Sequence, residues 1–151
     1  MDHIHFIGIG GTGLSAIAKV LLEQGYQVSG SDLNESPLFE GVKTAGGRVV
    51  LGHQAENIQG SDLVIRSSAI PDNNPEIQAA LAAKIPVVKR SEFLSQLVAD
   101  KKVLAVAGSH GKTTTTSMIT WILSDQNLDP SFIVGSVVNN LNTNAHAGKG
   151  K

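Results

Sequence analysis

Residues 3–14 read HIHFIGIGGTGL. The run His3–Ile7 suits a buried strand, Gly8–Gly13 matches the pattern G-x-G-x-x-G, and Leu14, Ile17 and Leu21 then fall on one helical face. A glycine loop between a strand and a helix lets backbone N–H groups approach a diphosphate, and the helix N-terminus supplies partial positive charge. This order of elements predicts a doubly wound, Rossmann-like α/β fold with a phosphate site at its first turn.

Three glycines of this loop have distinct expected roles. Gly8 permits the sharp turn, Gly10 lets the backbone approach the phosphates, and Gly13 lets the helix pack closely on its strand. Asp32 ends the second predicted strand, where a carboxylate accepts hydrogen bonds from a ribose or a base. The loop does not identify the nucleotide, so NAD and other ribose diphosphates stay open at this point.

Short apolar runs alternate with helical segments along the rest of the chain, which favours a parallel sheet with helices on both faces. Ser36 and Asn74, each followed by proline, predict two helix starts, and Ser91 predicts a third. We expect Leu81 on the buried face of the second of these helices. The further strands are expected at 27–30, 48–51, 63–66 and 86–88.

A second glycine loop, Gly108-Ser-His-Gly-Lys-Thr-Thr114, follows a predicted strand at 103–107. Lys112 suits the outer phosphates of a nucleoside triphosphate, and the Thr113 hydroxyl suits Mg²⁺. The loop is shorter than the usual phosphate loop, and we interpret His110 as a positioning or exposed residue rather than a base. A helix from Thr113 to Ser124 is expected to pack through Met118, Ile119, Ile122 and Leu123.

Two phosphate loops indicate two sheets, because an open α/β sheet normally offers one ligand crevice. We therefore expect one domain over residues 1–99 and the beginning of a P-loop ATPase-type central domain over 100–151. One more strand is expected at 132–134 and polar turns at 139–144. The tail after Val134 is expected to pack on residues 103–124 or on a neighbouring chain.

Composition excludes several classes of function. The chain has 151 residues, 41% of them hydrophobic, with a formal net charge of −1 and no cysteine. The charge gives no case for binding nucleic acid, and the absence of cysteine excludes disulfides and thiolate chemistry. No clean apolar run of eighteen residues occurs, so we expect a soluble, cytoplasmic protein with no membrane insertion.

Five segments carry a resemblance to a known family: HFIGIGGTGL (5–14), SGSD (29–32), GH (52–53), SSAI (67–70) and AGSHGKTTTT (107–116). In this order and at this spacing they resemble the Mur ligases over essentially the whole chain. The stretch 139–146 is also similar to the family segment that precedes its acidic metal-binding motif.

The resemblance implies a three-domain, ATP-dependent ligase of peptidoglycan synthesis. Its N-terminal domain would bind the UDP-sugar, its central domain ATP and Mg²⁺, and its C-terminal domain the amino acid. ATP would phosphorylate the muramoyl carboxylate, and an amine would attack the acyl phosphate. The run 10–15 fits the member that adds L-alanine to UDP-N-acetylmuramate better than the member that adds a tripeptide.

The resemblance also assigns residues to the two sites. The UDP-substrate site would comprise Gly8, Gly10, Gly11, Thr12, Gly13, Asp32, His53, Ser67 and Ser68. The ATP site would comprise Gly108, Ser109, His110, Gly111, Lys112, Thr113 and Thr114. Lys112 would also act catalytically by offsetting charge on the transferred phosphoryl group, and Thr113 would ligate Mg²⁺.

The remaining parts of such an enzyme would lie beyond Lys151, so we expect residues 1–151 alone to lack ligase activity. The oligomeric state is left open. Two alternatives stay beside the ligase: an NAD-dependent oxidoreductase domain that uses Gly8–Gly13 and Asp32, and a non-catalytic nucleotide sensor. The loop at 108–114 argues against the oxidoreductase, which has no use for a second phosphate cradle.

Overall fold

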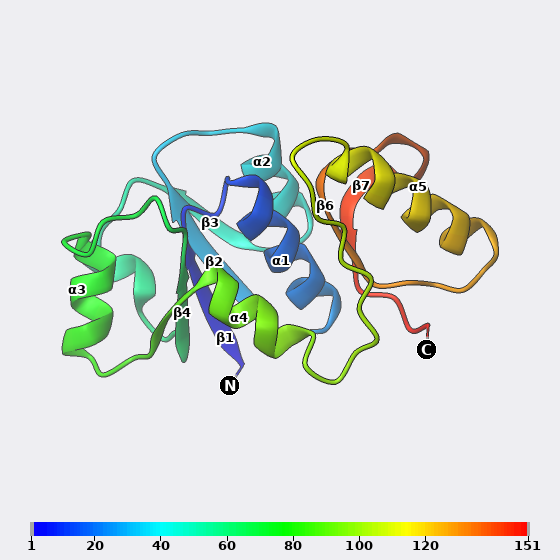
Figure 1. Cartoon of the computed structure of the whole chain (residues 1–151). Helices are drawn as coiled ribbons and strands as arrows, with labels where there is room; N and C mark the ends of the chain where they lie inside the picture. Colours follow the sequence, from blue (N-terminus) through cyan, green and yellow to red (C-terminus); the bar gives the residue numbers. More distant parts are fainter. Residues whose placement is uncertain (1, 151) are drawn as a thin grey trace.

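A computed structural model describes residues 2–150 of the chain and contains the predicted five-stranded parallel sheet (Figure 1). The strand order is β3-β2-β1-β4-β5. Successive strands are added toward one edge of the sheet from β1 to β3 and toward the other edge from β4 to β5, so the order reverses between β1 and β4. The strands are β1 (His3–Ile7), β2 (Gln27–Asp32), β3 (Arg48–Leu51), β4 (Leu63–Arg66) and β5 (Val87–Lys89). Such a reversal leaves an open crevice outside the carboxyl ends of the strands, where ligands bind in this class of fold.

Helices cover the two faces of this sheet. One face packs on α1 (Thr12–Glu23), α2 (Pro37–Thr44) and α4 (Arg90–Leu97), and its core includes Phe6, Leu14 and Ile65. The other face packs on α3 (Pro75–Ala82) and the short 3-10 helix η1 (Ala55–Ile58). Burial on both faces is the usual setting of a parallel sheet.

Helix starts agree with the capping predictions at two of three places. The Ser36 side chain accepts the Phe39 N–H at 3.1 Å, and Asn74 Oδ1 accepts the Glu76 N–H at 2.9 Å. In the third helix the prediction is wrong, because α4 begins at Arg90 and Ser91 lies inside it. The helix starts as soon as β5 ends, which leaves no room for a cap at Ser91.

Gly30, in the middle of β2, holds the first glycine loop close to the sheet. A Cβ atom at Gly30 would lie 2.8 Å from Ile9 Cβ and 2.8 Å from the Phe6 carbonyl oxygen. Real Cβ atoms do not approach that closely, so only glycine lets Ile9 fill this space. The position of the loop therefore depends on a glycine that lies outside its own motif.

We expect Gly30→Ala to lower the free energy of unfolding by about 2 kcal/mol, because the methyl group overpacks the loop against β2. Urea denaturation followed by circular dichroism measures the change. Gly41→Ala is the matched control, since its added methyl group would meet only the end of the Lys19 side chain. Equal stability of the two variants would contradict this account of Gly30.

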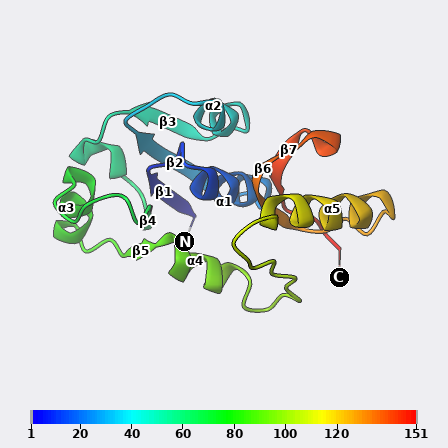
Figure 2. The same cartoon turned by 45° about the horizontal axis from the view of Figure 1, so that its top comes forward.

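The last third of the chain forms a second, smaller unit. It contains α5 (Lys112–Asp125), β6 (Phe132–Val138), the 3-10 turn η2 (Asn139–Leu141) and β7 (Thr143–His146), with β6 and β7 paired antiparallel. The hairpin lies beside both α1 and α5 (Figure 2). Two separate sheets are therefore present, as the two glycine loops predicted.

Side chains of α1 connect this hairpin to the first unit. Lys19 Nζ donates to Asn144 Oδ1 at 3.1 Å, and the His146 ring contacts Glu23 at 2.8 Å and Asp129 at 3.0 Å. We expected the tail to pack on residues 103–124 or on another chain. Packing on α5 agrees with that prediction, but the extensive contact with α1 was not foreseen.

The predicted strand at 103–107 is not formed. Val103 and Leu104 are exposed, and within residues 2–150 no neighbouring strand pairs with this segment. An apolar run becomes a strand only where a partner strand can accept its hydrogen bonds. Here β6 pairs with β7 instead, so 103–107 runs as irregular chain into the second glycine loop.

Several predicted core positions are also wrong. Met118 and Ile122 on α5 and Leu81 on α3 are exposed, although Ile119 and Leu123 are partly buried. Helical spacing identifies an apolar face but does not supply the surface that covers it. Near the end of the chain, β7 begins at Thr143, inside the segment that we expected to be turns. Of the helices described, none is long and apolar enough to cross a membrane.

Candidate functional site

The first glycine loop folds over the carboxyl end of β2. Gly8 has a φ of +89°, and the N–H groups of Gly8 and Ile9 both donate to the Ser31 carbonyl, at 2.8 and 3.0 Å. A positive φ is costly for any residue with a Cβ atom, so glycine is required at this turn. The chain then enters α1 at the carboxyl edge of the sheet, as predicted.

Asp32 lies directly under this loop. Its Oδ2 accepts the Gly10 N–H at 2.9 Å, and its Oδ1 accepts the Asn34 N–H at 3.2 Å. One carboxylate oxygen of Asp32, the residue that we expected to bind the ribose, is thus already used to fix the loop. Because the Gly10 N–H is occupied, the donors that stay free for a phosphate are those of the first turn of α1.

The N-terminus of α1 suits an anion. The N-cap is Gly11, no side chain caps the helix, and its first turn carries no acidic residue. The first N–H groups of a helix have no partner within it, and their dipoles favour negative charge. Thr12 and Gly11 are exposed at this end, so the donors face solvent.

Arg90 adds a positive charge at the same place, and the sequence analysis did not identify it. A Cβ atom built on Gly13 would lie 2.9 Å from Arg90 Nη1, so the guanidinium packs against the glycine. The nearest neighbours of a side chain at Gly13 would thus be atoms of Arg90, and not the strand on which we expected this glycine to let the helix pack. Arg90 directly follows β5, and the carboxyl ends of parallel strands meet at one edge of the sheet. Its position in the sequence could therefore have indicated that it lies near the glycine loop.

Ser67 and Ser68 follow β4 at this edge. The Ser67 N–H donates to the Ile7 carbonyl at 3.1 Å, and a Cβ atom on Gly8 would lie 3.2 Å from Ser67 Cβ. Ser68 is exposed. The structure thus brings both predicted serines to the start of the glycine loop, on the side opposite Asp32.

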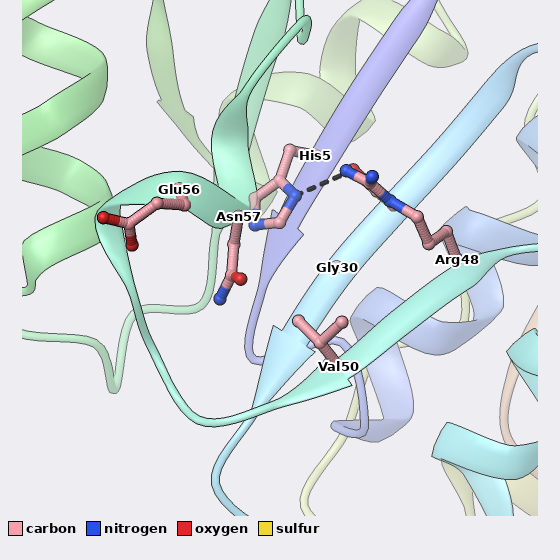
Figure 3. A pocket seen from close by; sticks show the side chains of 7 residues that line it. His5, Gly30, Arg48, Val50, Glu56 and Asn57 are labelled. Carbon is pink, nitrogen blue, oxygen red and sulfur yellow. Dashed lines mark hydrogen bonds between the residues drawn. The ribbon is translucent and has the colours of Figure 1, made fainter.

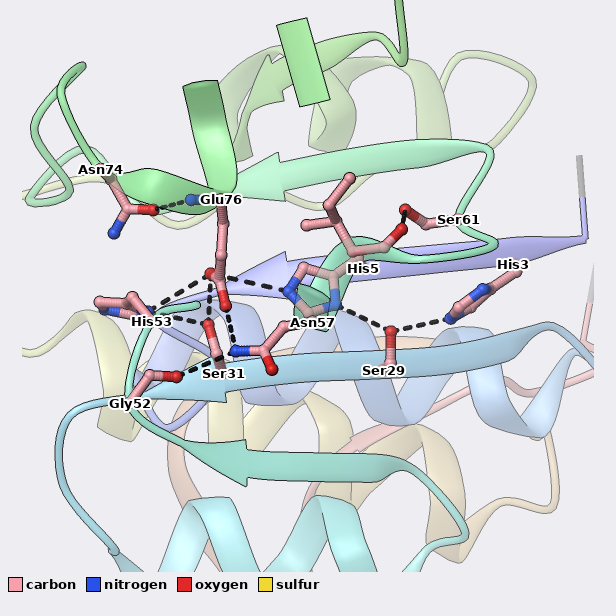
Figure 4. A network of polar contacts seen from close by, with 11 residues as sticks. His3, His5, Ser29, Ser31, Gly52, His53, Asn57, Ser61, Asn74 and Glu76 are labelled. Atoms are coloured by element: carbon pink, nitrogen blue, oxygen red, sulfur yellow. Dashed lines mark hydrogen bonds and ion pairs between the residues drawn. The ribbon is translucent and has the colours of Figure 1, made fainter. Parts of the chain in front are cut away.

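His53 belongs to a buried polar network on the α3 face of the sheet (Figure 4). Its centre is Glu76, whose side chain is fully buried. Glu76 Oε2 accepts the Ser31 hydroxyl at 2.6 Å, and Glu76 Oε1 accepts the Asn57 amide at 2.5 Å. His53 Nδ1 lies 2.9 Å from Ser31 Oγ and 3.3 Å from Glu76 Oε2.

Glu76 is charged at neutral pH in spite of its burial. Burial alone raises the pKa of this carboxyl, but the interactions with His5, Ser31 and Asn57 outweigh that effect, so the pKa lies below its ordinary value. A buried carboxylate with this many partners is held in one position. Sequence reasoning named His53 and missed the rest of the network.

A row of polar side chains on buried strands was the signal for it. His3 and His5 on β1, and Ser29 and Ser31 on β2, alternate with apolar residues and therefore share one face. Ser29 Oγ lies 2.8 Å from a ring nitrogen of each histidine. Two such rows on neighbouring parallel strands predict a polar layer, which Glu76 completes from α3.

A pocket of about 110 Å³ opens beside this network, on the sheet face over β2 and β3 (Figure 3). Its lining includes His5, Arg48, Val50 and Asn57. The volume suits a few water molecules and is too small for a nucleotide. The candidate site for a nucleotide is the carboxyl edge of the sheet, because this class of fold binds ligands there and the first glycine loop lies there.

The second glycine loop lies at the N-terminus of α5, a helix of fourteen residues. Gly111 is its N-cap with a φ of +77°, and Lys112 Nζ donates to the carbonyls of Gly108 and Ser109 at 2.6 and 3.3 Å. The loop thus keeps a cationic side chain above a free helix N-terminus. These residues fit a polyphosphate, and Thr113, the next residue, offers one hydroxyl ligand for Mg²⁺.

Ser109, His110 and Thr114 share this exposed segment. Within residues 2–150 no group of three or more histidine, aspartate or glutamate side chains is arranged as a metal site. Every predicted ATP-site residue thus lies in the loop 108–111 or in the first turn of α5. What the loop binds stays a prediction.

The fold and both loops define a class of protein. Residues 3–102 match the Mur ligase family, catalytic domain, and residues 106–150 match the Mur ligase middle domain. The chain therefore belongs to the Mur ligase family.

Its relatives include UDP-N-acetylmuramate–L-alanine ligases. That of Trichlorobacter lovleyi is 47% identical over 151 residues, and that of Geotalea daltonii is 48% identical over 151 residues. Each alignment covers all of this chain and 33% of the relative, so the chain spans about a third of their length.

Solved structures of related ligases have the same fold over almost all of this chain. The UDP-N-acetylmuramate–alanine ligase of Thermotoga maritima superimposes with a TM-score of 0.94 at 33% identity, over 99% of this chain and 36% of that chain. The UDP-N-acetylmuramate:L-alanyl-gamma-D-glutamyl-meso-diaminopimelate ligase of Neisseria meningitides gives 0.89 at 33% identity, over 97% and 46% of the two chains.

Proposed function

We propose that this chain binds UDP-N-acetylmuramate and the phosphates of ATP, as part of a ligase that joins L-alanine to the sugar nucleotide. One observation carries the proposal: two glycine loops each lie at an uncapped helix N-terminus, in a chain 47–48% identical to ligases of that name. An oxidoreductase domain would leave the second loop without a ligand.

The sugar nucleotide is assigned to the carboxyl edge of the five-stranded sheet. The first turn of α1 and the Arg90 guanidinium would bind the diphosphate, and the second Asp32 oxygen would accept from the uridine part. Ser67 and Ser68 would line the other side of the crevice. We infer a domain boundary near residue 100, where α4 ends and the irregular segment begins.

The second loop is assigned to ATP. Lys112 and the N-terminus of α5 would hold its phosphates, and Thr113 would contribute one ligand to a Mg²⁺ ion that neutralises phosphate charge. In the reaction, a muramoyl carboxylate oxygen forms a bond to the γ-phosphorus and ADP leaves. The L-alanine nitrogen then forms the amide bond to the carbonyl carbon, and inorganic phosphate leaves with the acyl oxygen.

We expect the 151-residue chain to bind UDP-N-acetylmuramate at least tenfold more tightly than NAD. The reason is the relationship to ligases named for UDP-N-acetylmuramate, which are 47–48% identical to this chain, because the first glycine loop alone would accept either diphosphate. Isothermal titration calorimetry with each ligand measures the ratio.

UMP serves as the control ligand, since it keeps the uridine part and lacks the diphosphate. A weaker response to UMP than to UDP would locate part of the affinity at the α1 N-terminus. Tight NAD binding with no response to the UDP-sugar would overturn the assignment in favour of the oxidoreductase. The tripeptide-adding ligase shares the same sugar nucleotide, so this titration does not separate the two ligases.

A further inference from the structure

Glu76 has no role in the assignments above, yet it is fully buried and contacts strand β2, the 3-10 helix η1 and the turn between β3 and η1. Its carboxylate receives hydrogen bonds from Ser31 on β2 and from Asn57 on η1, and it lies 3.3 Å from His53 Nδ1. Burying a charge is costly, and a well-packed apolar side chain would often serve stability as well. The carboxylate therefore calls for an explanation beyond packing.

The hydrogen bonds determine where the proton of His53 sits. A carboxylate only accepts, so the 2.6 Å contact between Ser31 Oγ and Glu76 Oε2 uses the hydroxyl proton of Ser31. Ser31 Oγ can then only accept from His53 Nδ1, at 2.9 Å. Both neighbours of Nδ1 are acceptors, which places a proton on Nδ1 and, in the neutral ring, a lone pair on Nε2.

The same carboxylate also fixes the backbone that carries His53. The Asn57 amide that donates to Glu76 also donates to the Gly52 carbonyl at 3.1 Å, and the Gly52 N–H donates to the Asp32 carbonyl at 2.8 Å. His53 is thereby held beside Asp32, the residue assigned to the uridine part. None of the described residues hydrogen-bonds its Nε2, and Figure 4 shows the far end of the ring pointing away from Glu76.

We propose that Glu76 is a positioning residue that acts through Ser31 to hold His53 as the Nδ1–H tautomer, so that His53 Nε2 accepts a hydrogen bond from the uridine part of the sugar nucleotide. The inference rests on the proposed function and deepens it. The donor is a hydroxyl or imide N–H group, which uridine carries on its ribose and on N3 of its base.

The variant Glu76→Gln tests the direction of the hydrogen bonds. Asn57 donates, so the glutamine oxygen must face Asn57 and its NH₂ group must face Ser31. Ser31 then accepts from glutamine and donates to His53 Nδ1, which moves the ring proton to Nε2. The fold keeps its shape, whereas the nitrogen that faces the ligand changes from acceptor to donor.

Long-range ¹⁵N–¹H NMR of the histidine rings at pH 8 reads this change directly, with His53→Asn identifying the His53 signals. We expect the Nδ1–H form in the unmodified chain, the Nε2–H form in Glu76→Gln, and no change in the control Glu40→Gln, which neutralises an exposed carboxylate on α2. An Nε2–H ring in the unmodified chain would overturn the proposal, whatever the variants do.

Calorimetry with UDP measures the consequence for binding. We expect Glu76→Gln and His53→Asn each to weaken UDP binding about tenfold, and the double variant to bind no more weakly than His53→Asn alone. If the two losses of UDP affinity multiply in the double variant, Glu76 does not act through His53. 2′-Deoxy-UDP and N3-methyl-UDP distinguish the two donors, because the analogue that lacks the donor should be insensitive to Glu76→Gln.

The proposed function and the positioning role of Glu76 can be disproved independently of each other. If the unmodified chain does not bind UDP-N-acetylmuramate, the proposed function fails. If it binds, and Glu76→Gln binds as tightly with an unchanged His53 tautomer, only the positioning role of Glu76 is wrong.

Discussion

Replacing Lys112 with alanine is expected to lower the rate of L-alanine ligation about a hundredfold to a thousandfold in a full-length enzyme that contains this chain. Lys112 is the first residue of α5, and its Nζ lies against the carbonyls of Gly108 and Ser109. The ammonium group is thus preorganised above the helix N-terminus. Charge that develops on the transferred phosphoryl group would be offset by this ammonium group.

A coupled assay for ADP release measures this loss, and Lys102→Ala is the matched control. Lys102 is also exposed and lies in the irregular segment that leads to the loop, outside the loop itself. Its replacement removes the same charge from the chain and should leave the rate unchanged. Equal rates for Lys112→Ala and the unmodified enzyme would contradict the assignment of the loop to ATP.

The five-stranded sheet was predictable from the sequence because the residues that specify each strand and helix lie next to one another in the chain. The strand His3–Ile7 is bounded by a glycine loop, and Ser36-Pro37 and Asn74-Pro75 mark helix starts with residues that supply the missing hydrogen bonds. Three of the five strands have the predicted bounds, and the order of elements alone implied the parallel arrangement.

The second unit was less predictable because its structure depends on partners distant in sequence. The run 103–107 has strand composition, but β6 pairs with β7 instead. Met118 on α5 has helical spacing, but no surface covers it. The same dependence on distant partners explains why the polar network around Glu76 was not predicted. Glu76 meets Ser31 and Asn57 across 45 and 19 residues of sequence, and no local pattern links them.

Replacing Gly10 with valine is expected to weaken the binding of UDP-N-acetylmuramate by at least about a hundredfold, a change of about 2.7 kcal/mol. Gly10 does not have a positive φ, so the reason is space rather than backbone conformation. A Cβ atom there would lie 3.0 Å from Asp32 Oδ2 and 3.2 Å from Ser36 Oγ. Neither neighbour can move freely, because Asp32 holds two N–H groups and Ser36 caps α2.

Because the backbone fixes the direction of the Cβ atom, the valine must displace Asp32 and Ser36 or shift the loop itself, and either change disturbs the place where the diphosphate would approach the first turn of α1. Calorimetry with UDP-N-acetylmuramate measures the loss, and thermal denaturation separates it from unfolding. Gly41→Val is the matched control, since the same change on α2 meets only the flexible end of Lys19. If Gly10→Val stays folded and binds with unchanged affinity, this loop is not the site, and the sugar nucleotide must bind away from the α1 N-terminus.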